Sequence, residues 1–234
     1  MGIAGNLSSV FDLLAKAASD RGIAKHAKWL KEAQERSVSF QSRWKDTTQS
    51  MMSGWHIVKA VQSLLNEEVI LLIDGGNIGQ WAHMLLATDR YPASWLTCGA
   101  SGVVGWGLPG AMAARLAYPD RPVLLISGDG SFGFTTTELE SAVRQKLPFV
   151  AVVANDKTWG IAASVQHNRY GDEGIIATRL GAIRYDKLAE ACGAQGLQAH
   201  NTEELKRAIQ QGFSAPVPVV IDVPITTLAP LGIT

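Results

Sequence analysis

The chain has 234 residues, and its 21 Lys and Arg residues are balanced by 21 Asp and Glu residues. A formal net charge of zero removes the long-range positive field of nucleic-acid-binding proteins. With 47% hydrophobic and 18% charged residues, and with no run of about 18 apolar residues and no signal segment, the composition indicates a soluble globular protein and no membrane partner. Cys98 and Cys192 lack CxxC spacing, so they suggest neither a disulfide framework nor a metal site, and they favour the cytoplasm.

Residues 1–50 are the most polar part of the sequence. Apolar residues recur at helical spacing between Leu7 and Leu14, and a charged helix is predicted from Lys25 to about Trp44. No strand-like run and no candidate chemistry occurs in this segment. Its large apolar side chains indicate that it packs on something outside the chain.

From Trp55 onward, apolar runs with strand character alternate with helical patterns. Strands are predicted at 69–73, 123–126, 149–153 and 217–223. Helices are predicted at 57–65, 111–116, 136–144, 185–193 and 202–213, and Thr135 with Glu138 forms a capping pattern for the third. This alternation is typical of an α/β fold, with a doubly wound, mainly parallel sheet and helices on both faces.

Three of the predicted strands end in loops rich in glycine or small polar residues. These loops are Asp74-Gly75-Gly76, Ser127-Gly128-Asp129-Gly130 and Asn155-Asp156-Lys157. Ligands of open α/β sheets bind outside the carboxyl ends of the strands, so the three loops are candidates for one shared site. The interval between Gly130 and Asn155 accommodates one helix and one strand, and a βαβ crossover then returns Asp156 to the side of Asp129.

Two carboxylates beside the backbone N–H groups of a helix start suit a hard divalent cation and a phosphate group. Mg²⁺ is the natural ion for such a site. A Gly-Asp-Gly loop taken alone is more often a turn that caps the following helix. The two loops at this spacing are together far more specific.

The run Gly128-Asp129-Gly130-Ser131, followed by Asn155-Asp156-Lys157-Thr158-Trp159-Gly160, resembles the thiamin diphosphate motif. The wider sequence is similar to that of the acetolactate synthase and benzoylformate decarboxylase-like family of decarboxylases and carboligases. Supporting segments occur in order within residues 55–225, at 74–76, 105–109, 117–123, 138–139 and 147–148. The resemblance implies a thiamin diphosphate-binding fold over residues 51–234, and it makes residues 1–50 a helical connector and the tail of a missing middle domain.

The resemblance also implies a metal site and a set of cofactor contacts. The implied Mg²⁺ ligands are the side chains of Asp129 and Asp156 and the backbone carbonyl of Thr158. The family usually has Asn at the second position, so Asp156 adds one negative charge beside the diphosphate. If the register slips by one residue, Asn155 is the ligand instead.

Backbone N–H groups near Gly76, near Gly130 and in the turn from Thr158 to Ile161 are implied to face the diphosphate, because glycines permit close approach of the backbone. Val104 corresponds to the apolar residue that supports the thiazolium ring in the family, with simple core packing as the alternative. No catalytic residue is assigned. The implied cofactor-binding residues are Gly76, Asn77, Ile78, Gly102, Val104, Gly128, Asp129, Gly130, Ser131, Asp156, Thr158, Trp159, Gly160 and Ile161.

In this family, a glutamate that contacts the pyrimidine ring of the cofactor belongs to a separate N-terminal domain and is usually reached across a subunit interface. We therefore expect this chain to need a pyrimidine-binding domain, from another chain or from a missing N-terminal region, within a homo- or hetero-oligomer. A fragment of a longer enzyme and a separately encoded subunit are both open, and the polar N-terminal segment favours the fragment.

The leading hypothesis is therefore a domain of a thiamin diphosphate-dependent lyase or transferase that decarboxylates a small 2-oxo acid. The alternative is a non-catalytic cofactor-binding or regulatory subunit. A Rossmann dehydrogenase is disfavoured, because no GxGxxG opens a helix after the first strand. The substrate and acceptor stay open, because Val165 stands where acetolactate synthases carry a bulky Trp.

Overall fold

A computed structural model describes residues 5–22, 26–42, 51–86 and 94–226. The chain divides into two compact units, Met1–Thr47 and Thr48–Thr234. In the first unit, α1 (Leu7–Arg21) and α2 (Ala27–Ser42) occupy the segments that the sequence predicts to be helical. The Asn6 side chain caps α1 by accepting a hydrogen bond from the Ser9 N–H, and Gly22 ends the helix in the left-handed conformation.

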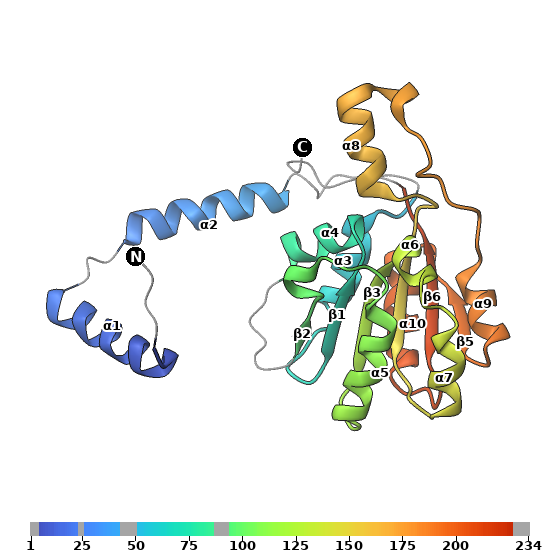
Figure 1. Cartoon of the computed structure of the whole chain (residues 1–234), viewed down its shortest axis with the longest axis horizontal. Helices are drawn as coiled ribbons and strands as arrows, with labels where there is room; N and C mark the ends of the chain where they lie inside the picture. The colour runs from blue at the N-terminus through green and yellow to red at the C-terminus, as the bar shows by residue number, and fades with distance from the viewer. Residues whose placement is uncertain (1–4, 23–25, 43–50, 87–93, 227–234) are drawn as a thin grey trace. The chain divides into compact units, whose positions relative to one another are not determined.

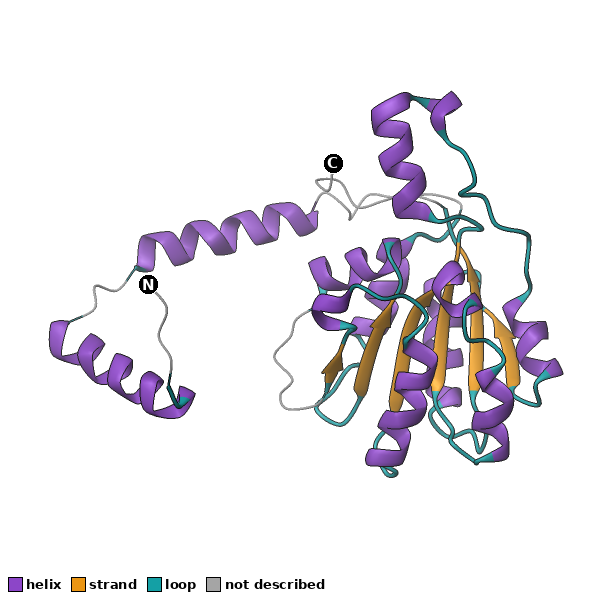
Figure 2. Cartoon of the chain, viewed as in Figure 1, coloured by secondary structure: helices purple, strands orange, loops and turns teal. Residues whose placement is uncertain are grey.

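The second unit is built on a six-stranded, all-parallel sheet, drawn in orange in Figure 2. The strands are β1 (Ile70–Asp74), β2 (Trp95–Leu96), β3 (Val123–Gly128), β4 (Val150–Asn155), β5 (Gln195–Gln198) and β6 (Val219–Pro224). Their order across the sheet is β2-β1-β3-β4-β6-β5. The four long strands are apolar and almost wholly buried, as expected when helices cover both faces. Their parallel register brings the carboxyl ends of β1, β3, β4 and β6 to one edge.

Helices cover both faces of this sheet, which confirms the predicted α/β fold class (Figure 1). On one face, α3 (Gly54–Gln62), α4 (Asn77–Leu85) and α10 (Thr202–Gly212) pack together. On the other, α5 (Gly107–Ala117), α7 (Glu138–Arg144) and α9 (Tyr185–Ala191) share one apolar core with the strands. The short α6 (Asp129–Gly133) and the longer α8 (Gly160–Tyr170) begin where β3 and β4 end.

Two local predictions were wrong. The segment from Ser127 to Gly130 is not a loop, because β3 continues to Gly128 and α6 begins at Asp129. The predicted side-chain cap of α7 is absent, because the Thr135 hydroxyl donates a hydrogen bond to the Gly105 carbonyl, at 3.0 Å, rather than capping the helix. The Thr135 hydroxyl is thus used in a contact with a distant loop and not at the start of the helix.

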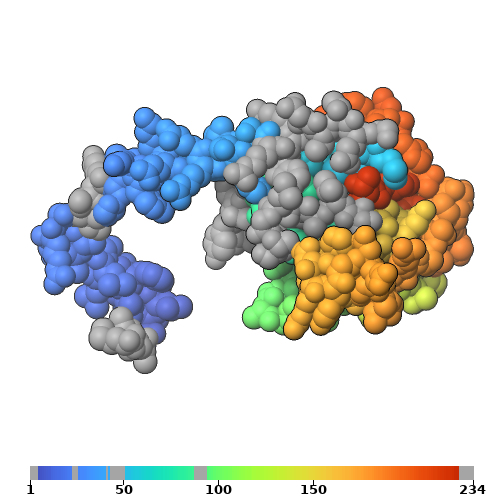
Figure 3. Space-filling view, turned by 90° about the horizontal axis from the view of Figure 1, so that it is seen from above, coloured from blue at the N-terminus to red at the C-terminus, as the bar shows by residue number. Residues whose placement is uncertain are grey.

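α8 and the segment that follows it form part of the surface at the carboxyl edge. Figure 3 looks onto this edge and shows that part of the chain in orange. Val165, Tyr170 and Ile176 are exposed there. Within the described ranges, no helix is long and apolar enough to cross a bilayer.

Candidate functional site

A cavity of about 360 Å³ opens at the carboxyl edge of the sheet, where the ends of β1, β3 and β4 meet. It gathers every residue that the sequence resemblance assigns to the cofactor. The lining consists of Gly76, Asn77, Ile78, Gly102, Val104, Gly128, Asp129, Gly130, Ser131, Asp156, Thr158, Trp159, Gly160 and Ile161, with Ala154, Ala162 and Ile225 in addition. The last three lay outside the prediction.

Asp129 and Asp156 face this cavity from neighbouring strand ends. Asp129 is 3% exposed, and its Oδ1 accepts a hydrogen bond from the Gly130 N–H at 2.9 Å. Burial, followed by the nearby charge of Asp156, raises the pKa of Asp129 to about 7, and burial raises the pKa of Asp156 to about 6. Both carboxyl groups thus resist ionisation in this cavity, and a divalent cation bound between them would stabilise their charged forms.

The Thr158 carbonyl is a candidate third oxygen ligand. Thr158 pairs with Arg179 in an isolated antiparallel bridge. The flanking bonds, from Trp159 N–H to the Thr178 carbonyl and from Leu180 N–H to the Lys157 carbonyl, are both 2.7 Å long. Thr158 therefore occupies the non-hydrogen-bonded position, and its own carbonyl points away from residues 178–180.

A metal at this position would depend on few side chains. Within residues 5–22, 26–42, 51–86 and 94–226, no group of three His, Cys, Asp or Glu side chains is placed to hold a metal ion. The two carboxylates and the Thr158 carbonyl are the candidate protein ligands in this cavity, and phosphate oxygens are the usual complement of Mg²⁺ in such sites.

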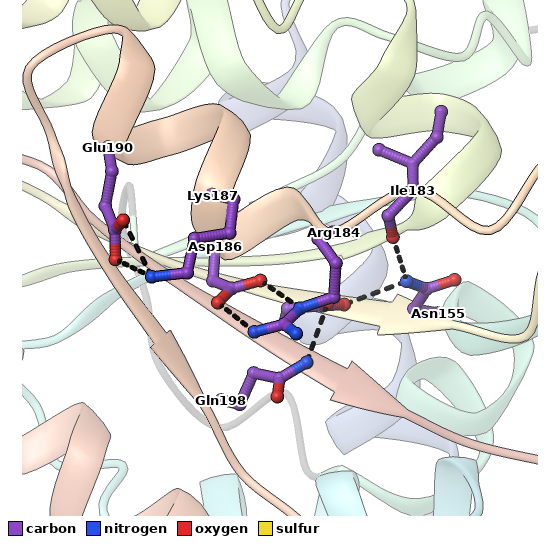
Figure 4. A network of polar contacts seen from close by, with 8 residues as sticks. Asn155, Ile183, Arg184, Asp186, Lys187, Glu190 and Gln198 are labelled. Carbon is purple, nitrogen blue, oxygen red and sulfur yellow. Dashed lines mark hydrogen bonds and ion pairs between the residues drawn. The ribbon is translucent and has the colours of Figure 1, made fainter.

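The structure distinguishes between Asn155 and Asp156. Asn155 donates from Nδ2 to Asp222 Oδ1 at 2.9 Å and to the Ile183 carbonyl at 3.0 Å (Figure 4). It does not line the cavity, whereas Asp156 does. Because successive strand residues point to opposite sides, only one of the two can face the cation. The geometry therefore favours Asp156 as the candidate ligand.

The amide of Asn77 is a buried polar group at the start of α4. Asn77 is 9% exposed, its side-chain amide lies beside the Asp156 carboxyl, and its Oδ1 has no hydrogen-bond partner in the described residues. Burial raises the pKa of Asp156, and hydrogen bonds from the Thr158 N–H and from the Asn77 side chain offset this rise only in part. Asn77 therefore brings a polar group with a free oxygen to the cavity wall, next to Asp156.

The glycines of the motif differ in the space around them. A Cβ added at Gly130 would lie 2.9 Å from the indole ring of Trp159. One added at Gly160 would lie 3.0 Å from Asp156 Oδ2. At Gly128 the nearest atom would be 3.8 Å away, so packing within the chain leaves room for a methyl group there.

Asp74 was expected to share the site, and it does not line the cavity. Its buried carboxylate instead accepts hydrogen bonds from the Gly105 N–H, at 3.1 Å, and the Gly107 N–H, at 2.9 Å. These bonds fix the segment that places half-buried Val104 at the cavity wall. The role of Asp74 in this fold is therefore to hold a loop.

Tyr185 is a contributor that the sequence did not reveal. Its hydroxyl is buried and donates a hydrogen bond to the Asp129 carbonyl at 2.9 Å, and its ring lies edge-on to Phe132. Phe134, also outside the prediction, makes a similar ring contact with Trp159. These contacts join parts of the chain that are distant in sequence, and no local motif signals them.

Comparison with known proteins places this site in context. The family profile described as "Thiamine pyrophosphate enzyme, C-terminal TPP binding domain" matches residues 74–223. Acetolactate synthase large subunit IlvG of Mycobacterium tuberculosis is 29% identical over 226 residues, which are 95% of this chain and 40% of that protein. Acetolactate synthase of Bacillus subtilis is 34% identical over 169 residues, 72% of this chain and 29% of that protein.

A third relative, 2-hydroxyacyl-CoA lyase 2 of Mus musculus, is 30% identical over 191 residues, 79% of this chain and 30% of that protein. The chain thus spans two-fifths or less of the length of these relatives.

Two solved structures have a similar fold. Benzoylformate decarboxylase from Polynucleobacter necessarius superposes with a TM-score of 0.71 at 24% identity, over 79% of this chain and 35% of that one. The 4-hydroxybenzoylformate decarboxylase of Rhodococcus jostii gives a TM-score of 0.70 at 25% identity, over 77% of this chain and 34% of that one.

Proposed function

This chain belongs to the thiamine pyrophosphate enzyme family and carries its C-terminal cofactor-binding domain, and on that premise we propose how its residues hold thiamin diphosphate and Mg²⁺ and which reaction they serve. The observation that carries the proposal is the cavity in which the buried carboxyl group of Asp129 and the half-buried carboxyl group of Asp156 lie with the amide of Asn77.

Asp129, Asp156 and the Thr158 carbonyl hold the Mg²⁺ ion in this proposal. Support comes from the shared cavity, from the raised pKa values of both carboxyl groups and from the direction of the Thr158 carbonyl. A cation beside the two carboxylates replaces the protons that burial otherwise favours, so metal binding and proton release are coupled.

The diphosphate binds at the start of α4, where Gly76, Asn77 and Ile78 line the cavity. The first N–H groups of a helix have no partner within the helix and carry partial positive charge, which suits phosphate oxygens. The Asn77 amide, which lies beside the Asp156 carboxyl, adds a polar group to this wall of the cavity. The free space beside Gly128 accommodates the diphosphate in this proposal, and a Cβ at that position would narrow it.

Bound thiamin diphosphate supplies a nucleophilic carbon that cleaves the bond next to a carbonyl group. Around it, the chain's own residues bind, orient and exclude water. Ile78, Ile161 and Ile225 give the cavity apolar walls, and Val104 supports the ring side of the cofactor. We assign no proton-transfer residue within this chain.

For the whole enzyme we propose the decarboxylation of a small 2-oxo acid and transfer of the resulting acyl group. Residues 51–234 act as the cofactor-binding domain, residues 1–50 as a helical connector, and a pyrimidine-binding domain completes the site within an oligomer. The cytoplasm is the proposed location, because both cysteines are free thiols. The acetolactate synthases and the 4-hydroxybenzoylformate decarboxylase to which the chain is similar support the reaction class.

Calorimetric titration of the full chain with thiamin diphosphate and Mg²⁺ tests the binding. We expect binding that requires the metal and is lost in Asp129→Ala, while Glu140→Gln, a change at an exposed carboxylate on α7, serves as the matched control. Unchanged affinity in Asp129→Ala would refute the metal assignment. Turnover of 2-oxo acids, followed as CO₂ release, is expected only after a pyrimidine-binding domain is added. Cofactor binding without turnover in that complex would favour the non-catalytic subunit.

A further inference from the structure

Asn155, which does not line the cavity, belongs to a buried network of hydrogen bonds at the end of β4. Asp222 of β6 is 1% exposed, and it accepts hydrogen bonds from Asn155 Nδ2 at 2.9 Å and from Gln198 Nε2 at 3.3 Å. Because β4, β6 and β5 are neighbours in the sheet, these contacts join three strands near their carboxyl ends.

Asn155 is held at three points. Its Nδ2 donates both hydrogens, one to Asp222 and one to the Ile183 carbonyl at 3.0 Å (Figure 4). Both neighbours are acceptors, which requires that the nitrogen rather than the oxygen of the amide face them. The backbone carbonyl of Asn155 also accepts a hydrogen bond from the Ile225 N–H at 3.0 Å. Little freedom is left at this residue.

The segment that supplies the Ile183 carbonyl is itself anchored. Arg184 makes a two-point ion pair with Asp186, with Arg184 Nε 2.8 Å from Oδ1 and a second guanidinium nitrogen 2.6 Å from Oδ2. Figure 4 shows this pair next to Asn155 and Gln198. The Ile183 carbonyl that accepts from Asn155 thus directly precedes a residue whose side chain is paired with α9.

We propose that Asn155, held by Asp222 and the Ile183 carbonyl, is a positioning residue that directs the carboxylate of Asp156 into the cavity. The inference rests on the proposed function, since it presupposes a cation between Asp156 and Asp129. Asn155 immediately precedes Asp156 at the end of β4, so a rotation of one backbone unit redirects the other. Metal ligation tolerates only small departures in distance, and loss of such supporting partners typically weakens metal binding by about 10- to 100-fold.

The burial of a carboxyl group at Asp222 supports this role. A buried carboxylate lowers stability relative to an apolar side chain unless its hydrogen bonds compensate. Asp222 lies between Ile221 and Val223 in a strand that is otherwise apolar. An apolar side chain at this position would be enough to pack the sheet. A hydrogen-bond acceptor for Asn155 requires an oxygen, which the Asp222 carboxyl provides.

The test measures the affinity of the full chain for Mn²⁺ in the presence of inorganic pyrophosphate, by electron paramagnetic resonance, with thermal unfolding recorded for each variant. Asn155→Ala is expected to weaken Mn²⁺ binding by about 10- to 100-fold. Asp222→Asn keeps an oxygen for Asn155 to donate to, so it should bind close to wild type. Gln198→Ala removes only the outer donor and is the matched control. If Asn155→Ala does not fold, Asp222→Leu removes the same acceptor with an apolar side chain, and it should weaken Mn²⁺ binding likewise.

A second background separates positioning from general support. In Asp156→Ala, the further change Asn155→Ala should cause no additional loss of Mn²⁺ affinity, because the ligand through which it acts is gone. An equal loss in both backgrounds, or a lowered unfolding temperature with unchanged affinity, overturns the positioning role. A wild-type chain that binds no Mn²⁺ overturns the proposed function together with it, whereas binding that is unchanged in Asn155→Ala overturns the positioning role alone.

Discussion

Replacing Gly128 with alanine is expected to weaken cofactor binding while leaving the fold intact. The backbone at Gly128 has φ −78° and ψ 153°, which any residue adopts. A methyl group there would meet its nearest protein atom at 3.8 Å, an ordinary contact distance. Stability should therefore be unchanged, or higher by about 0.4–1 kcal/mol through reduced freedom of the unfolded chain.

Gly130, two residues further along, provides the contrast. A methyl group there would lie 2.9–3.1 Å from three atoms of the Trp159 ring, which is itself packed against Phe134. Overpacking of this kind typically destabilises a protein by about 1–3 kcal/mol. Gly130→Ala is thus expected to lower stability, and Gly128→Ala is not.

Urea unfolding and calorimetric titration with thiamin diphosphate and Mg²⁺ separate the two effects. Gly128→Ala should unfold at the wild-type urea concentration or above it, and it should bind the cofactor at least about tenfold more weakly, equivalent to about 1.4 kcal/mol. Wild-type cofactor affinity in a stable Gly128→Ala variant would refute the placement of the diphosphate next to β3.

Three further outcomes are expected. Without divalent metal, the folded chain holds protons on Asp129 and Asp156 that the unfolded chain releases near pH 4. The free energy of unfolding should therefore fall by at least about 1 kcal/mol as pH rises from 5 to 8. Thermal unfolding in EDTA measures this fall, excess Mg²⁺ should reduce it, and a flat profile would contradict it. Tyr185→Phe removes a buried hydrogen bond to the Asp129 carbonyl and should destabilise the chain by about 1 kcal/mol in urea; no change would mean that the bond contributes nothing. Asp74→Ala leaves two backbone N–H groups without their acceptor, so it should destabilise by about 2 kcal/mol or more and increase amide hydrogen exchange around Val104; unaltered exchange there would count against its role in holding the loop.

The four long strands were predictable because they are buried on both faces, and burial of that kind leaves a continuous apolar run. The edge strands were not. β2 is two residues long, and β5 has the sequence Gln-Gly-Leu-Gln, which is only partly buried and carries no apolar run. The helix α8 was also missed, and its N-cap residue, Trp159, makes no side-chain capping bond that a sequence motif could signal.

The site was predictable where short motifs carry it. The residues assigned by resemblance line one cavity, because strand ends in a parallel sheet converge. Spacing could not decide between Asn155 and Asp156, since a shift of one residue turns every side chain to the opposite face. The Asn155–Asp222 bond joins residues 67 positions apart, and only the folded chain reveals it.

The most direct test of the account is the position of a metal in crystals of this chain soaked with Mn²⁺ and thiamin diphosphate, located by the anomalous scattering of manganese. The account predicts an anomalous peak within about 2.5 Å of oxygens from Asp129, Asp156 and the Thr158 carbonyl. A peak that contacts neither carboxylate, while the cofactor is bound in the crystal, would contradict it.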